Sequence, residues 1–84
     1  MVELKQNGIY FNPMRVGTST FGRVCQITRI EGEQVSVCYI ADRYESTMSR
    51  TAAGNFEPYD KGKVEADRDA LRTILSNFET FLQQ

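Results

Sequence analysis

The sequence predicts one α+β domain, in which a small, strongly bent antiparallel β-barrel over residues 4–59 is followed by a long amphipathic α-helix over residues 61–82. Up to Tyr59, short runs of β-branched and aromatic residues alternate with turn residues, which is typical of antiparallel strands. From Val64 onward, apolar residues recur at the three- and four-residue spacing of a single helix face. A chain of 84 residues is too short for two hydrophobic cores, so we expect both parts to form one domain.

The first strand is expected at residues 8–11, which combine glycine with three strand-forming residues. Asn12 and Pro13 interrupt that strand, and glycine, serine and threonine then dominate residues 16–20. We therefore expect a long surface loop between the first and second strands.

A β-hairpin is expected from residues 21–30 and 35–40, because these two strand-like runs flank a turn segment in which Gly32 can adopt a positive φ angle. A turn at Gly32 and Glu33 predicts the following cross-strand pairs: Ile30 with Val35, Thr28 with Val37, Ile27 with Cys38, and Cys25 with Ile40. This register predicts a hairpin with two apolar sides. One side holds Val24, Ile30, Val35, Val37 and Tyr39, and the other holds Cys25, Ile27, Cys38 and Ile40. Both sides must be covered, and the C-terminal helix is the expected cover.

The rest of the predicted barrel is less regular. Residues 41–44 are expected to form a loop, and residues 45–50 an edge strand with few β-forming residues. Residues 51–55 resemble one helical turn that ends at Gly54, and residues 56–59 carry two aromatic rings that we expect to close the sheet.

The C-terminal helix is expected to begin after Asp60, whose side chain can cap the first turn. Glu65 and Asp67 add negative charge where the helix dipole favours it. Beyond Val64, the apolar face consists of Leu71, Ile74, Leu75, Phe78, Phe81 and Leu82. Two arrangements remain open for this face: packing against the chain's own barrel, or association with a second copy or with a groove of another protein.

Residues 4–59 resemble the SH3-like small barrels in their short first strand, long loop, bent hairpin around Glu31 and Gly32, fourth strand, helical turn and closing segment. The chain is also similar to short uncharacterised barrels of bacteriophages and mobile elements, which implies a regulator or inhibitor of a host protein. Type II dihydrofolate reductase shares this architecture and lines its pore with a Val-Gln-Ile-Tyr segment. The nearest segment here, residues 35–39, reads Val-Ser-Val-Cys-Tyr, and this departure argues against that activity.

The composition argues against an enzyme, a cofactor or a metal. Histidine, the usual general base and the commonest zinc ligand, is absent. Cys25 and Cys38 are expected to be unreactive thiols, and the glycines do not have the spacing of a phosphate-binding loop. No segment has the apolar length of an export signal or a membrane span, so we expect a cytoplasmic protein that does not enter a membrane.

A non-enzymatic protein-interaction module that forms a homodimer is our first hypothesis. The partner-binding surface is expected at Tyr10, Arg43, Tyr44, Arg50 and Tyr59, and self-association is expected along the helix at Leu71, Ile74, Leu75, Phe78, Phe81 and Leu82. The alternative is a nucleic-acid-binding barrel that uses Arg15, Arg23, Arg29, Arg43 and Arg50, although the net charge is −1. A third hypothesis is a small-molecule binder or unusual enzyme formed across an oligomer interface.

Overall fold

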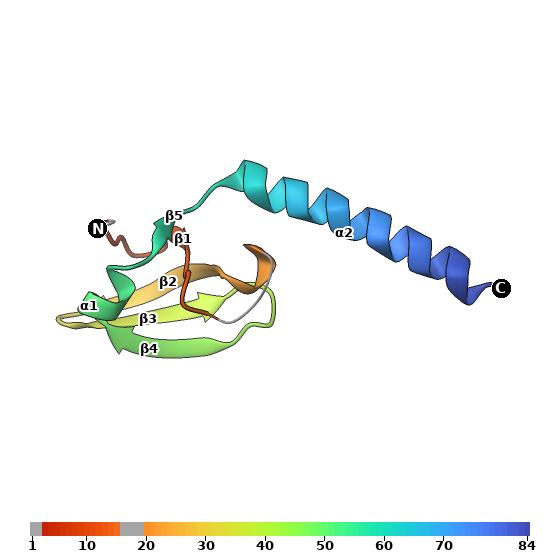
Figure 1. The fold of residues 1–84 in the computed structure, drawn as a ribbon. Coiled ribbons are helices and arrows are strands. Elements are labelled where there is room, and N and C mark those ends of the chain that lie inside the picture. Colours follow the sequence, from red (N-terminus) through yellow and green to blue (C-terminus); the bar gives the residue numbers. More distant parts are fainter. Residues whose placement is uncertain (1–2, 16–19) are drawn as a thin grey trace.

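The computed structural model describes residues 3–15 and 20–84. Over these residues the chain forms a five-stranded antiparallel sheet, a one-turn helix and a long C-terminal helix, which confirms the α+β class. The long helix projects away from the sheet (Figure 1), and the molecule therefore measures 56 × 22 × 19 Å.

The strands are β1 (Ile9–Phe11), β2 (Val24–Glu31), β3 (Gln34–Tyr39), β4 (Glu45–Ser49) and β5 (Glu57–Pro58). They lie in the order β4-β3-β2-β1-β5, and each neighbouring pair is antiparallel. The predicted fourth strand is therefore an edge strand, and the predicted closing segment pairs with β1. Within the described residues β4 and β5 do not pair with each other, so the sheet is not closed into a barrel.

The hairpin between β2 and β3 turns at Gly32, whose φ angle of +56° favours glycine. Next to this turn the observed register agrees with the predicted one, because Ile30 lies opposite Val35. A β-bulge between Ile27 and Arg29 then shifts the pairing by one residue, and Thr28 in the bulge is exposed. The prediction that Thr28 lies opposite Val37 is therefore wrong.

The bulge brings the large side chains of both strands to one face of the sheet. Ile27 lies opposite Val37 instead of Cys38, and Cys25 lies opposite Tyr39 instead of Ile40. The predicted division of the hairpin into two apolar sides is therefore wrong for Cys25 and Ile27, and also for Val24, which lies on the face opposite Val35 and Val37. The hydrophobic core contains Tyr10, Cys25, Ile27, Val35, Val37, Tyr39, Ala53 and Phe56.

The core face of the sheet is covered by the short helix α1 (Arg50–Ala53) and by Phe56, not by the C-terminal helix. The hydroxyl of Ser49 caps α1 by accepting a hydrogen bond from the amide of Ala52 at 3.1 Å. The chain leaves the helix at Gly54, as predicted. Phe56 then turns its ring into the core and approaches the ring of Tyr10, with 6.2 Å between the ring centroids.

The opposite face of the sheet carries a smaller apolar cluster near the start of the C-terminal helix. Phe11 and Val24 are paired neighbours and both are buried. The ring of Tyr59 lies beside that of Phe11, with 5.7 Å between centroids. Phe21, predicted to lie in a strand, belongs instead to the single 3-10 turn η1 (Thr20–Gly22).

The C-terminal helix α2 (Lys61–Leu82) has the predicted bounds. One carboxylate oxygen of Asp60 accepts hydrogen bonds from the amides of Gly62 and Lys63, at 2.9 and 3.4 Å. The helix contacts η1 near its start and then leaves the sheet (Figure 1). No residue of α2 is buried, so the expectation that this helix covers the sheet is wrong.

We predict that Ile27→Ala lowers the free energy of unfolding by about 2–5 kcal/mol, because the side chain is fully buried and its removal leaves a cavity. Ile9→Ala is the matched control, since Ile9 is 40 % exposed and its loss should cost clearly less. Urea denaturation followed by circular dichroism measures both. Equal losses for the two variants would contradict this description of the core.

Candidate interaction surfaces

The helix α2 presents an uncovered apolar stripe. Its members are Leu71, Ile74, Leu75, Phe78, Phe81 and Leu82, with exposed fractions that rise from 44 % at Leu71 to 75 % at Leu82. Phe78 and Phe81 meet edge to face, with 6.4 Å between ring centroids. All six residues predicted for self-association therefore lie on one surface, and nothing else in the described chain covers them.

Asp67 lies on the same side of α2 as the stripe, one turn before Leu71, and separates the stripe from Val64. One carboxylate oxygen of Asp67 accepts hydrogen bonds from the amide of Thr20 at 2.9 Å and from its hydroxyl at 2.7 Å. Both hydrogen bonds favour the charged carboxylate and so hold the pKa of Asp67 below its usual range. The bond from the Thr20 amide has the larger effect and the bond from the Thr20 hydroxyl the smaller. This contact attaches the start of the helix to η1, and the free part of the stripe begins after it.

Tyr10 does not belong to the predicted partner-binding surface. It lies opposite Cys25 with its ring on the core face, and only 7 % of its surface is exposed. Its hydroxyl accepts a hydrogen bond from the amide of Lys5 at 3.0 Å and donates one to the carbonyl of Glu3 at 2.9 Å. The expectation of an exposed Tyr10 is wrong because the register of β1 turns this ring inward.

The other four residues of that predicted surface are exposed but lie apart. Arg50 begins α1, and its amide donates to the carbonyl of Glu33 in the β2–β3 turn at 2.8 Å. Arg43 and Tyr44 lie in the connection between β3 and β4, at the other end of β3. Tyr59 lies on the opposite face of the sheet from the core, beside Phe11. These residues therefore do not form one groove.

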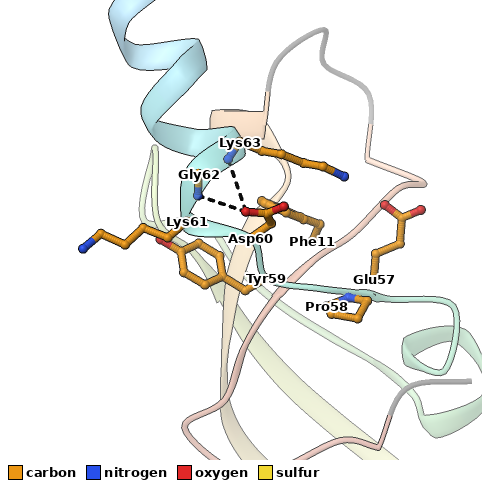
Figure 2. Close-up of a pocket in the computed structure, with 8 residues that line it drawn as sticks. All are labelled: Phe11, Glu57, Pro58, Tyr59, Asp60, Lys61, Gly62 and Lys63. Carbon is orange, nitrogen blue, oxygen red and sulfur yellow. Dashed lines mark hydrogen bonds between the residues drawn. The ribbon is translucent and has the colours of Figure 1, made fainter.

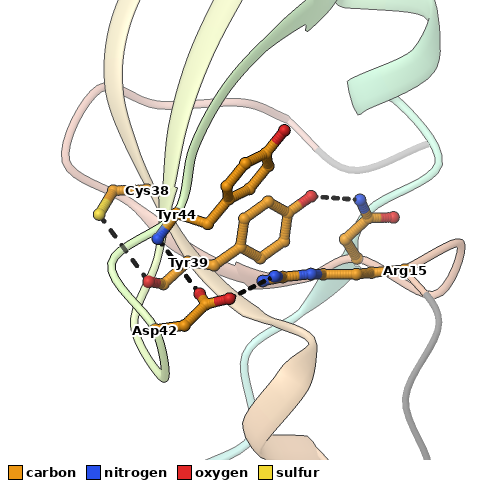
Figure 3. A network of polar contacts seen from close by, with 6 residues as sticks. Arg15, Cys38, Tyr39, Asp42 and Tyr44 are labelled. Carbon is orange, nitrogen blue, oxygen red and sulfur yellow. Dashed lines mark hydrogen bonds and ion pairs between the residues drawn. The ribbon is translucent and has the colours of Figure 1, made fainter.

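A cluster that the sequence did not indicate gathers at the β3–β4 connection (Figure 3). The guanidinium of Arg15 lies over the ring of Tyr39, 3.8 Å from its centroid, and 5.5 Å from that of Tyr44. The same guanidinium donates to Asp42 at 2.8 Å, and this bond is the main reason why the pKa of Asp42 is lowered. Asn12 donates to the hydroxyl of Tyr39 at 2.7 Å.

This cluster connects residues 12–15, which follow β1, to the end of β3 and the residues after it. Asn12 and Arg15 reach residues that are 27 positions away in sequence, so no local pattern indicates the contact. Arg15 is already engaged by a carboxylate and an aromatic ring, which leaves little of its charge for a phosphate. Arg29 is likewise paired, with Glu31 on the same strand.

Two depressions lie where the sheet meets the helix. The larger, of about 620 Å³, is lined by Phe11 and residues 57–63 and holds side chains of both charges (Figure 2). The carboxylate of Asp60 is already occupied as the helix cap, and Lys61 and Lys63 extend in opposite directions. The smaller, of about 260 Å³, is lined almost entirely by apolar residues: Ile9, Phe21, Val24, Ile40, Ala41, Tyr59 and Val64.

Within residues 3–15 and 20–84, no group of three Cys, Asp or Glu side chains is arranged to hold a metal ion. Both cysteines are free, and Cys25 is buried. No helix in the same described ranges is long and apolar enough to cross a membrane.

No protein-family model, no curated protein and no solved structure matches this chain. Among the surfaces formed by residues 3–15 and 20–84, the stripe on α2 is the most extensive apolar one.

We predict that Asp67→Ala increases hydrogen exchange at the Thr20 amide, because the variant lacks the carboxylate that this amide binds. In the unmodified chain the contact is complete above the ordinary pKa of aspartate and is lost as the pH falls through the lowered pKa of Asp67. Nuclear magnetic resonance measures the protection factor. Asp69→Ala is the control, since the Asp69 side chain pairs with the adjacent Arg68. Unchanged protection in Asp67→Ala would show that the contact contributes nothing.

We predict that iodoacetamide labels Cys38 in the folded protein and reaches Cys25 only after denaturation. Burial raises the pKa of Cys25 to about 11, against a weaker opposing effect of the nearby Arg15 charge. Little reactive thiolate therefore forms at mildly alkaline pH. Peptide mass spectrometry of native and denatured samples measures both sites. Equal labelling rates in the native protein would contradict the buried placement of Cys25.

Proposed function

We propose that this chain is a non-enzymatic protein-binding module whose C-terminal helix is its binding surface. The observation that carries the proposal is the stripe on α2, which is 44–75 % exposed at six large apolar residues. Isolated apolar residues are common on protein surfaces, but contiguous patches of several hundred Å² mark sites of association. A single rigid helix that presents such a patch fits the geometry of helix-in-groove and helix–helix recognition.

The size of the exposed stripe supports this proposal. Each of its six side chains leaves on the order of 100 Å² uncovered, by comparison with the 150–250 Å² that a buried aromatic residue covers. Burial of about 600 Å² at roughly 25 cal/mol per Å² would be worth on the order of ten kcal/mol before entropy is subtracted. This gross gain is of the same size as the roughly 4–15 kcal/mol that association costs in lost freedom, so the stripe offers enough apolar area to bind a partner.

The distribution of the arginines gives less support to nucleic-acid binding. Arg15 and Arg29 pair with carboxylates, and Arg43 and Arg50 lie at opposite ends of β3. Binding that depends on phosphates needs cations concentrated on one face. The hypothesis of a small molecule bound across an oligomer interface gains little from the larger depression, because its Asp60 carboxylate already caps α2 and its two lysines extend in opposite directions.

We further propose that the sheet belongs with the SH3-like barrels. Two features support this relationship: the strand order β4-β3-β2-β1-β5, and the single helical turn α1 between β4 and β5 along the chain. The resemblance to bacteriophage and mobile-element barrels makes a regulator or inhibitor of a host protein the specific form of the proposal. Two free cysteines suit a reducing compartment such as the cytoplasm.

We predict that Phe78→Glu removes association through the helix without unfolding the sheet, because Phe78 is 58 % exposed and contacts no core residue. In dilute solution its free energy of unfolding should stay within about 0.5 kcal/mol of the unmodified value. Denaturation at several protein concentrations measures this effect, because association stabilises a folded protein more at higher concentration.

Ser76→Glu is the matched control, since it adds the same charge to an exposed helix position outside the stripe. A loss of several kcal/mol in Phe78→Glu at every concentration, with no loss in Ser76→Glu, would contradict the proposal. It would show that the stripe is part of the chain's own core.

A further inference from the structure

We infer that the occupant of the stripe is a second copy of this chain, whose α2 packs antiparallel against the first. This inference rests on the proposed function and names its partner. The positions of the apolar residues, the place of Asp67 and the charges beside the stripe all favour this partner and this direction.

The apolar residues form complementary layers when two copies run in opposite directions. Leu71 and Phe78 occupy the first position of successive heptads, and Ile74 and Phe81 the fourth. In an antiparallel pair the first position of one helix faces the fourth of the other. With the symmetry axis beside residue 76, Leu71 faces Phe81 of the second copy, and Ile74 faces its Phe78. Each layer thus sets an aliphatic side chain against an aromatic one, while a parallel pair would stack identical residues.

Asp67 determines how far the two helices overlap. With the axis at residue 76, the two helices overlap over residues 70–82, because α2 ends at Leu82, and Asp67 keeps its bonds to Thr20 outside this overlap. A slide of one heptad would bring Val64 against Phe81 but would bury the Asp67 carboxylate against Phe78, which is costly for a charged group. A parallel pair would place the two Asp67 carboxylates together in the same seam.

The charges on the flank of the stripe favour the same direction. Arg72 and Glu79 lie seven residues apart on one side of the stripe, and both are exposed. In the antiparallel register Arg72 of each copy lies opposite Thr80 of the other, one residue from Glu79, which gives two pairs of opposite charge. In a parallel pair this flank would face the opposite one, which carries the uncharged Ala70 and Asn77.

The geometry of the helix also suits a second copy. The overlap from residue 70 to the end of α2 at Leu82 is about 20 Å long at 1.5 Å per residue. Because α2 leaves the sheet (Figure 1), an antiparallel pair places the two sheets at opposite ends, where they do not collide. About 600 Å² per copy is close to the roughly 800 Å² per partner of a standard interface.

The first test is the solution mass of the full chain by light scattering over a wide range of concentrations. We expect twice the 9.6 kDa of one chain, and a monomer for Phe78→Glu. A monomeric unmodified chain at every concentration would overturn the second-copy inference. The proposed function would survive that result if Phe78→Glu still folds with unchanged stability, and it would fail together with the inference if that variant unfolds.

The second test determines direction and register by oxidation of single cysteines in a Cys38→Ser background, where Cys25 stays buried. Leu71→Cys mixed with Phe81→Cys should form a disulfide between the two variants, identified by intact mass, while neither variant alone should cross-link. Self-cross-linking of each variant alone would show a parallel pair and overturn the inference. Ser76→Cys, outside the stripe, is the control and should remain reduced, and circular dichroism verifies that each variant folds.

Discussion

The bulge at Thr28 is the constraint on which the rest of the fold depends. Side chains alternate between the faces of a strand, so one extra residue transfers every later side chain to the other face. Without it, Cys25 and Ile27 would point away from Val35 and Val37, and the core would be divided between two thin layers. With it, a single face carries the whole main core, and one short helix with Phe56 is enough to cover that face. The long C-terminal helix is therefore not needed as a lid.

Local chemistry allowed much of the fold to be predicted from the sequence. The turn at Gly32, the cap at Asp60 and the spacing of the helix stripe are short-range signals, and the structure agrees with each of them. The position of the bulge depends on how two strands fit together, and a run such as residues 24–30 does not reveal it. Tyr10 was misplaced for a similar reason, because its inward orientation is decided by its pairing with Cys25.

The candidate surface divides in the same way between local and distant information. Periodicity identifies the six apolar residues of the stripe, but the same pattern suits a helix packed on its own sheet and one that projects from it. The difference arises from contacts remote in sequence: Asp67 holds the helix to Thr20, 47 positions away, and Tyr59 packs on Phe11. The cluster of Arg15, Tyr39 and Asp42 likewise joins segments that no motif connects.

The open sheet has two edges, and each is poorly suited to pairing with strands of other molecules. At one edge β5 is only two residues long and includes Pro58, which has no amide hydrogen to donate. At the other edge β4 presents Glu45 and a run of serine and threonine interrupted by one methionine. Extension of the sheet into cross-β fibres is thus disfavoured at both sides. The chain can therefore expose a large apolar surface and still resist amyloid formation, because that surface lies on the helix α2 and not on an edge strand.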